Sequence, residues 1–312
     1  MKAIHYDSTA REAGVMKMQE SSVLETILRR DRLIVISGLI TVVVLAWLYL
    51  LMGAGMGMTV FEMSMPTLPW QSASEKTMSG AHSEMSHTTG MGDMMRKAHM
   101  AMMQPAVWTT GYAVVMGVMW WVMMIAMMLP SASPMILLFA RVNRSQKVQE
   151  APFVPTSTFA VGYLVVWGAF SLLATSLQWG LERLGLLSTM MTSTSALFGG
   201  FLLMTAGVYQ LTPFKHACLR HCRNPFQFVT HHWRTGTFGA FRMGIEHGAF
   251  CVACCWFLMG LLFVGGVMNL YWIVGLAILV LLEKTIPTGH WLGAITGVGL
   301  IMWGGWMVVG AL

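Results

Sequence analysis

The residues with the clearest chemical potential lie in the stretch 244–256, where one imidazole and three thiols fall within nine positions. On a helix each residue turns by about 100°, so His247, Cys251 and Cys254 fall within an arc of about 60°. Cys255 lies at the edge of the same face. An imidazole and several thiolates that converge on one spot would form a site for a soft metal ion.

The two remaining cysteines, Cys218 and Cys222, lie just upstream, with His216 and His221 beside them. All five cysteines of the 312-residue chain therefore fall within 38 positions. A single buried cysteine is ordinarily a small apolar side chain on a helix. Five cysteines clustered with several histidines instead favour metal binding or thiol redox chemistry.

The spacing of these residues leaves the identity of the metal open. Thiolate ligands suit Cu(I), Zn(II) or an iron–sulfur cluster, and the pattern differs from the paired Cys-x2-Cys spacing of a zinc ribbon. A c-type haem is excluded because Cys255 stands where the Cys-x-x-Cys-His signature requires histidine.

A stripe of methionines marks the apolar segment that begins near residue 107. Met119, Met123 and Met127 recur at steps of four residues and share one helix face. Thioethers bind Cu(I) without losing a proton, so a ladder of them could pass copper through an apolar medium. Methionine also fills gaps between packed helices, and the pattern alone favours this packing interpretation.

The segment 53–106 is a second region rich in methionine and histidine. It contains twelve methionines, and its candidate ligands are His82, Met85, His87 and His99. Its Pro, Gly, Ser and Thr residues argue against a packed core. Imidazole and thioether without cysteine suit copper capture in an oxidising compartment, because neither is lost to disulfides. A solvated low-complexity linker is the competing interpretation, and both stay open.

The composition is that of a polytopic membrane protein. The chain is 56% hydrophobic and 10% charged, whereas about 25% of residues are charged in an ordinary soluble domain. Several apolar runs reach the roughly 20 residues that cross a bilayer. We therefore predict an all-α fold, a polytopic transmembrane helical bundle of about seven spans.

We divide the chain into four parts: a cytosolic amphipathic lead-in (1–32), a first span (33–52), an extracytoplasmic Met/His-rich segment (53–106) and a core membrane domain (107–312). The core is expected to hold the Cys/His cluster and six further spans, near 107–129, 159–179, 195–211, 244–267, 270–284 and 291–309. Glu283 and Lys284, at the end of the sixth span, are typical of a snorkelling pair or an orientation anchor at a membrane boundary.

The Lys and Arg residues predict the orientation. Most lie in the loops after the second, fourth and sixth spans, as the positive-inside rule expects. This places the N-terminus in the cytosol and the C-terminus outside, in a bacterial inner (cytoplasmic) membrane. The net charge of +6 is therefore not a nucleic-acid signal. The first 30 residues lack the features of a signal peptide, so we expect no processing.

Several blocks of the chain resemble the predicted metal-binding integral membrane proteins grouped as domain of unknown function 2182. The blocks are residues 121–135, 209–215, 218–222, 244–259 and 266–270, with the pair Glu283-Lys284. The resemblance implies a multi-span membrane protein with a metal site and no assigned reaction.

We accordingly predict an integral membrane metal-binding protein, rather than an enzyme, that acquires, transfers or transports copper. Zinc or another soft metal is the alternative cargo. Two other functions stay open: a non-catalytic accessory subunit of a larger membrane metalloenzyme or respiratory complex, and a membrane thiol-redox protein. The predicted partners are the lipid bilayer and a membrane protein complex or copper-delivery partner.

Overall fold

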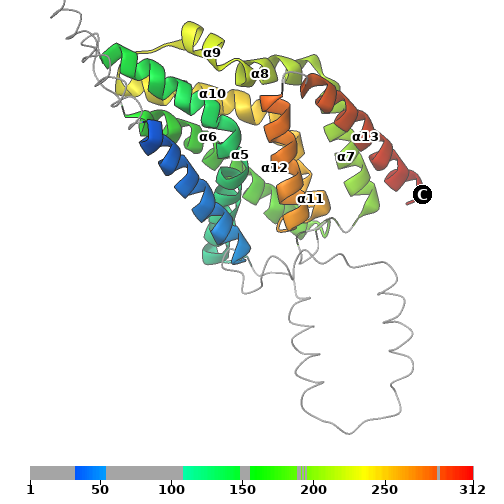
Figure 1. The fold of residues 1–312 in the computed structure, drawn as a ribbon. Coiled ribbons are helices and arrows are strands. Elements are labelled where there is room, and N and C mark those ends of the chain that lie inside the picture. The colour runs from blue at the N-terminus through cyan, green and yellow to red at the C-terminus, as the bar shows by residue number, and fades with distance from the viewer. Residues whose placement is uncertain are drawn as a thin grey trace, which may run out of the picture.

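The computed structural model describes residues 32–53, 108–147, 155–187, 191, 193, 195–286 and 289–311. Across these residues the chain forms helices and one isolated β-bridge, between Leu187 and Ser193, so the predicted all-α fold is confirmed (Figure 1). The helices are Arg32–Leu51, α5 (Thr110–Lys147), α6 (Thr156–Arg183), α7 (Ala196–Leu211), α8 (Pro213–Arg223), α9 (Pro225–His232), α10 (Gly236–Gly260), α11 (Leu262–Gly265), α12 (Leu270–Thr285) and α13 (Gly289–Val309).

Each of the seven predicted spans coincides with a helix, but the helices differ in length. Five are long and apolar enough to cross a bilayer, and the described residues hold six if the bent pair α7–α8 counts as one span. Helices α7 and α12 have 16 residues each, or about 24 Å, against a hydrocarbon core of about 30 Å. The helices are thus compatible with a membrane protein.

Helix α5 runs through both of its prolines and continues to Lys147, beyond the end that we predicted for this span near Leu129. Pro134 has no N–H to donate to the carbonyl of Pro130, which would normally break the helical ladder. The Ser133 hydroxyl donates to that carbonyl instead, at 2.8 Å. The freed backbone group is therefore satisfied within the helix itself.

A sharp bend separates α7 from α8. Thr212 ends α7 in an extended conformation and caps α8, where its hydroxyl accepts a hydrogen bond from the Lys215 amide. Pro213 follows at the first position of α8, where its missing N–H costs nothing. The two helices meet at 65°, so α8 lies across one end of the bundle together with α9 (Figure 1).

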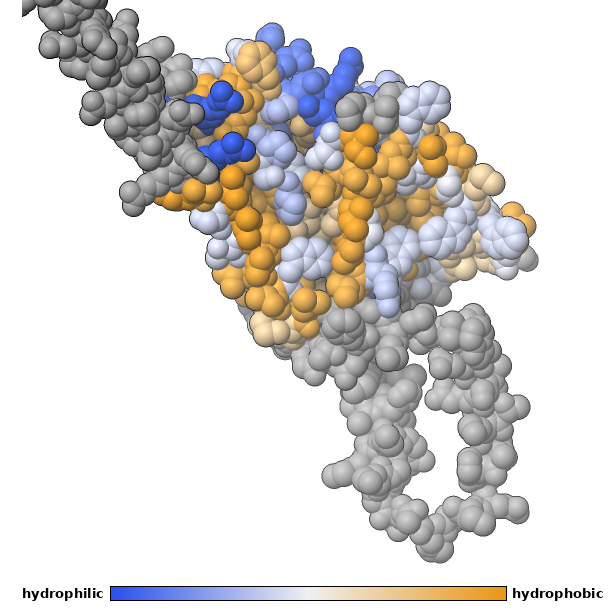
Figure 2. Space-filling view, viewed as in Figure 1, coloured by the Kyte–Doolittle hydropathy of each residue, from blue (hydrophilic) through white to orange (hydrophobic). Residues whose placement is uncertain are grey.

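Figure 2 shows apolar side chains over most of the bundle surface, with hydrophilic ones gathered along the edge where α8 and α9 lie. A bilayer-spanning bundle has this distribution, since its flanks face lipid and its ends face water.

Glycines bring two helix pairs into close contact. A Cβ built on Gly244 of α10 would lie 2.1 Å from the Phe159 carbonyl oxygen of α6, and one on Gly162 would lie 2.3 Å from that of Phe241. Gly207 and Gly304 play the same part between α7 and α13. Small residues at helix crossings let the backbones approach, as is common in membrane bundles.

We predict that Gly244→Ala destabilises the protein by about 1–3 kcal/mol, because the added methyl group must push α6 and α10 apart. Gly275→Ala is the matched control, because a Cβ added there would meet no atom within 4 Å. Alanine is the better helix former, so this control should be neutral or slightly stabilising. Thermal unfolding of the detergent-solubilised protein measures both, and equal melting temperatures would contradict the close crossing.

Candidate metal centre

Helix α10 carries one buried face formed by the residues that the sequence singled out. His247, Cys251, Cys254 and Cys255 are each at most 3% exposed. The crossing with α6 at Gly244 holds this face against α6, one turn before His247. Four side chains of types that can bind metals are therefore enclosed in the interior of the bundle.

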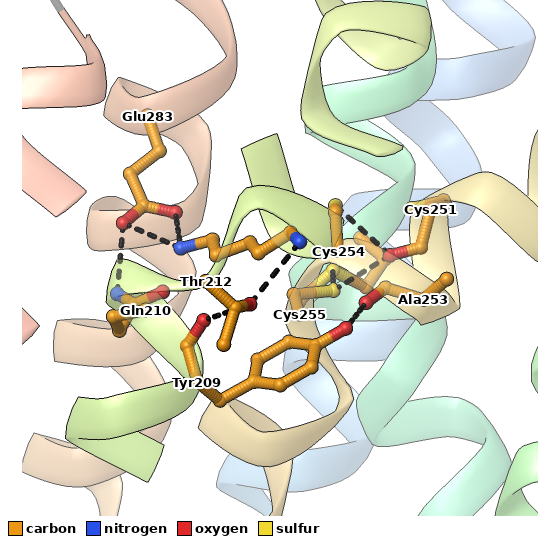
Figure 3. A network of polar contacts seen from close by, with 10 residues as sticks. Tyr209, Gln210, Thr212, Cys251, Ala253, Cys254, Cys255 and Glu283 are labelled. Carbon is orange, nitrogen blue, oxygen red and sulfur yellow. Dashed lines mark hydrogen bonds and ion pairs between the residues drawn. The ribbon is translucent and has the colours of Figure 1, made fainter. Parts of the chain in front are cut away.

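The thiols of α10 make short contacts with one another and with their own helix. Cys254 Sγ and Cys255 Sγ donate to the Cys251 carbonyl oxygen at 3.1 and 3.0 Å (Figure 3). Cys255 Sγ also lies 4.0 Å from Met128 Sδ of α5. These contacts gather three sulfur atoms of α10 beside a thioether of the neighbouring helix.

Helix α8 adds a fourth thiol to this group. The Cys222 side chain is half-buried and interacts electrostatically with Cys254. Cys218, one turn earlier, is buried but has no hydrogen bond with the α10 thiols among the described contacts; its interaction with Cys254 is electrostatic. The bend at Thr212 thus lays α8 against α10, so that both cysteines of α8 interact electrostatically with Cys254.

A lysine reaches the same group from α12. Lys284 Nζ lies 2.9 Å from Cys251 Sγ and 3.3 Å from the Ser131 hydroxyl of α5. The Tyr163 hydroxyl, from α6, lies 3.1 Å from the same sulfur. Cys251 is therefore the point at which side chains from α6, α10 and α12 meet. A nearby ammonium stabilises a thiolate, the form of cysteine that binds metals.

Lys284 and Glu283 are both buried, so the prediction that they snorkel at a membrane boundary is wrong. Glu283 accepts hydrogen bonds from Lys215 Nζ of α8, at 2.7 and 3.0 Å, and from Gln210 Nε2 of α7, at 2.9 Å (Figure 3). Each charge has a partner inside the protein, which removes the reason to extend toward water.

The His247 imidazole lies in an aromatic enclosure. The ring centroids of Phe228, Tyr163 and Phe159 are 5.4, 5.9 and 6.1 Å from its own. Its buried Nδ1 has no hydrogen-bond partner among the described residues. An unpaired buried nitrogen is costly, so it marks a position at which an additional partner would be favourable.

The methionine stripe of α5 is fully buried. Met119, Met123 and Met127 are at most 1% exposed. Met116 lies on the same face, and its Sδ is 3.8 Å from Gln178 Nε2 of α6. Met128 lies on a neighbouring face and contacts Cys255. One thioether of α5 therefore lies beside the cysteine cluster.

The remaining sequence candidates are two histidines of α8 and four residues that the structure does not describe. His221 is exposed on α8, and His216 is half-buried on the same helix. His82, Met85, His87 and His99 lie outside the described residues. In the described part of the chain, no three His, Cys, Asp or Glu side chains already stand in a metal-binding arrangement. The α10 thiols are engaged in hydrogen bonds instead.

The sequence interpretation missed Tyr163, Lys215 and Lys284 as neighbours of the cluster. For Lys284 a signal existed, since an ionisable residue at the end of an apolar run is commonly functional and paired. Lys215 lies in a basic segment, where a lysine is expected to face solvent. For Tyr163 no signal existed, because its role depends on the crossing of α6 with α10.

The fold and the buried thiol group define an apolar helical bundle with a soft-metal type of donor set. A family model described as PpoB2, copper chaperone, matches residues 117–307, and the chain belongs to this family. The family is copper-related, and the match does not confirm the resemblance to domain of unknown function 2182. No curated protein and no solved structure matches the sequence.

We predict that Glu283→Gln strongly destabilises the fold, by about 3–5 kcal/mol, because it leaves the buried Lys215 ammonium without a counter-charge. The double variant Lys215→Met/Glu283→Leu should recover most of this loss, since an apolar pair of similar volume replaces a buried ion pair at little cost. Thermal unfolding of both variants decides the matter. A double variant as unstable as Glu283→Gln would show that the charges themselves are required.

Proposed function

We propose that this protein is an integral membrane copper handler that binds Cu(I) at a centre formed by Cys222, Cys251 and Cys254. The observation that carries the proposal is the burial of the Cys251, Cys254 and Cys255 thiols on one helix, with Cys222 of α8 in electrostatic interaction with Cys254, in a chain of a copper chaperone family. Thiolates select Cu(I) over harder cations, and the apolar enclosure protects it from water and oxidants.

The neighbouring donors suit the same ion. Met128 Sδ contacts Cys255, and thioether is a ligand type that Cu(I) accepts. The free Nδ1 of His247, one helical turn from Cys251, offers an imidazole. The thiols of Cys254 and Cys255 would give up their bonds to the Cys251 carbonyl when they bind the metal, and thiols release protons on binding.

Lys284 has a defined part in this scheme. A thiolate in an apolar interior needs a positive partner, and the Lys284 ammonium supplies it before copper arrives. Two or more thiolates on one Cu(I) would carry a net negative charge. The Lys284 ammonium, which also lies 3.3 Å from the Ser131 hydroxyl, would balance that charge. Lys284 would therefore have a negative partner both before and after the metal binds.

The supply route follows from the methionine stripe. In the orientation given by the positive-inside rule, the Thr110 end of α5 faces outward and the thiols lie toward the cytosol. Copper collected outside, where His82, Met85, His87 and His99 are proposed ligands, would pass along Met119, Met123 and Met127 to the thiols. A delivery partner or a membrane complex would complete the transfer.

We expect purified wild-type protein to carry copper, and Cys251→Ser/Cys254→Ser to lose it, because serine keeps the size but is a poor ligand for Cu(I). Cys218→Ser is the control and should retain the metal. Metal analysis of protein purified without chelators measures all three. Wild-type protein with less than about one tenth of an ion per chain would contradict the proposal.

We expect Met123→Leu to leave the copper capacity of the thiol centre unchanged but to slow its loading from outside. Leucine has nearly the same volume, so the packing cost should stay below about 1.5 kcal/mol. The measurement is the rate of Cu(I) uptake into proteoliposomes of known protein orientation. Val122→Leu, on another face of α5, is the control. Unchanged uptake in Met123→Leu would mean that the methionines serve packing alone.

A further inference from the structure

Two aromatic rings separate the buried His247 from the polar end of the bundle. Phe228, on the short helix α9, is 2% exposed, and its ring meets the His247 imidazole edge-on at a centroid distance of 5.4 Å. Phe250 of α10 packs edge-on against Phe228, at 6.4 Å. Phe228 thus contacts His247 directly, and both rings of this aromatic pair contact a histidine nearer the surface.

Those two histidines flank the aromatic pair on its outer side. The His232 ring stacks on Phe228, with centroids 4.9 Å apart, and its side chain is 34% exposed. The His221 ring stacks on Phe250 at 4.3 Å and is exposed. His232 and Phe250 are also in contact, at 6.5 Å. Three imidazoles from α8, α9 and α10 therefore surround one pair of phenyl rings.

In both outer histidines Nδ1 makes the hydrogen bond to the protein, and Nε2 is left for a metal ion. His232 Nδ1 donates to the Glu246 carboxylate at 3.2 Å, and His221 Nδ1 donates to the Ala217 carbonyl at 3.0 Å. In a neutral ring this leaves the lone pair on Nε2. A carboxylate or carbonyl on the other nitrogen is the usual support of a metal-binding histidine.

Two arginines hold the Glu246 carboxylate in place, so its hydrogen bond fixes the orientation of the His232 ring. Its carboxylate accepts from Arg242 Nε at 3.1 Å and from the Arg234 guanidinium at 3.3 Å, in addition to His232. The residue next to His247 in the chain thus orients His232 rather than His247. Consecutive side chains on a helix diverge, which explains the choice.

We infer that His232 and His221 form a surface exchange station, at which Cu(I) passes between His247 and a partner past the ring of Phe228. The inference rests on the proposed thiol centre, and it adds the route by which that centre is filled or emptied. Each step exchanges one ligand for another, so copper stays Cu(I) and no electron is transferred. Imidazole suits copper and holds it less firmly than thiolate, as a transfer point requires.

The position of Phe228 explains how the path between His247 and His232 can exclude water and still let a copper ion pass. The ring shields His247 from water while it stays in place. Helix α9 has only eight residues, and short peripheral elements open locally at a small cost in free energy. A rotation of the ring or a shift of α9 would bring His232 and His247 to the same ion in succession.

The test uses the full-length protein loaded with one Cu(I), and follows transfer to bathocuproine disulfonate, a soluble Cu(I) chelator. In His232→Asn the amide nitrogen replaces Nδ1 and can still donate to Glu246, but no Nε2 remains. We expect this variant and His221→Asn to slow the transfer about tenfold, the scale seen when a metal site loses one supporting group. Equilibrium copper content should stay as in wild type, which also shows that the variants fold.

His231→Asn is the matched control. His231 neighbours His232 on α9, is exposed, and has its Nδ1 bound to the Gln227 carbonyl at 3.0 Å, but it has no described ring contact with Phe228 or Phe250. It should transfer copper at the wild-type rate, whereas Phe228→Ala should transfer it faster. Equal rates in His231→Asn, His232→Asn and His221→Asn would overturn the station. A wild type without copper would instead overturn the thiol centre itself.

Discussion

The contact between the Lys284 ammonium and the Cys251 sulfur, at 2.9 Å, is the constraint on which the centre depends. A lysine enclosed in an apolar bundle costs several kcal/mol unless a partner balances its charge. Its neighbour Glu283 has the same requirement and meets it through Lys215. Two consecutive residues of α12 therefore tie this helix to α10 and to α8, the two helices that carry all five cysteines.

The backbone around this contact is shaped to permit it. The glycine crossing lets α6 lie close enough to α10 for the Tyr163 hydroxyl to reach Cys251 and the Met128 carbonyl of α5. The bend between α7 and α8 turns a helix that would otherwise leave the bundle back across its end. A larger residue at the crossing or a straight connection would separate the thiols. The cluster is thus a property of helix placement as much as of cysteine content.

The sequence predicts the parts of this centre that follow from the period of a single helix. The shared face of His247, Cys251 and Cys254 and the buried stripe at Met119, Met123 and Met127 are of this kind, because a period of 3.6 residues specifies which side chains lie together. The continuation of α5 beyond Leu129 could not be read from the pattern. It depends on the Ser133 hydroxyl, which donates to the Pro130 carbonyl in place of the N–H that Pro134 lacks.

Contacts between helices could not be predicted in the same way. Lys215 and Glu283 are separated by 68 residues, and Lys284 lies 33 residues from Cys251. The hydrophobic pattern of a sequence can indicate that a charged residue is buried, but it cannot identify the residue that pairs with it. From the sequence alone, Glu283 and Lys284 could therefore be either a pair at the membrane boundary or a buried pair.

The burial of the thiols also bears on the alternative of a thiol-redox protein. Exchange with a partner's disulfide requires the attacking sulfur to approach the partner in line, and Cys251 and Cys254 are each 1% exposed. A copper ion needs far less room, because it can move between donors that side-chain rotation brings within reach. Thiolates bind Cu(I) tightly, so the proposed centre would need features that weaken this binding before it could transfer the ion. In our proposal the Lys284 ammonium, which would compete for Cys251, and the imidazoles beside Phe228 supply these features. For this reason we favour transfer of a bound ion over electron exchange as the proposed function.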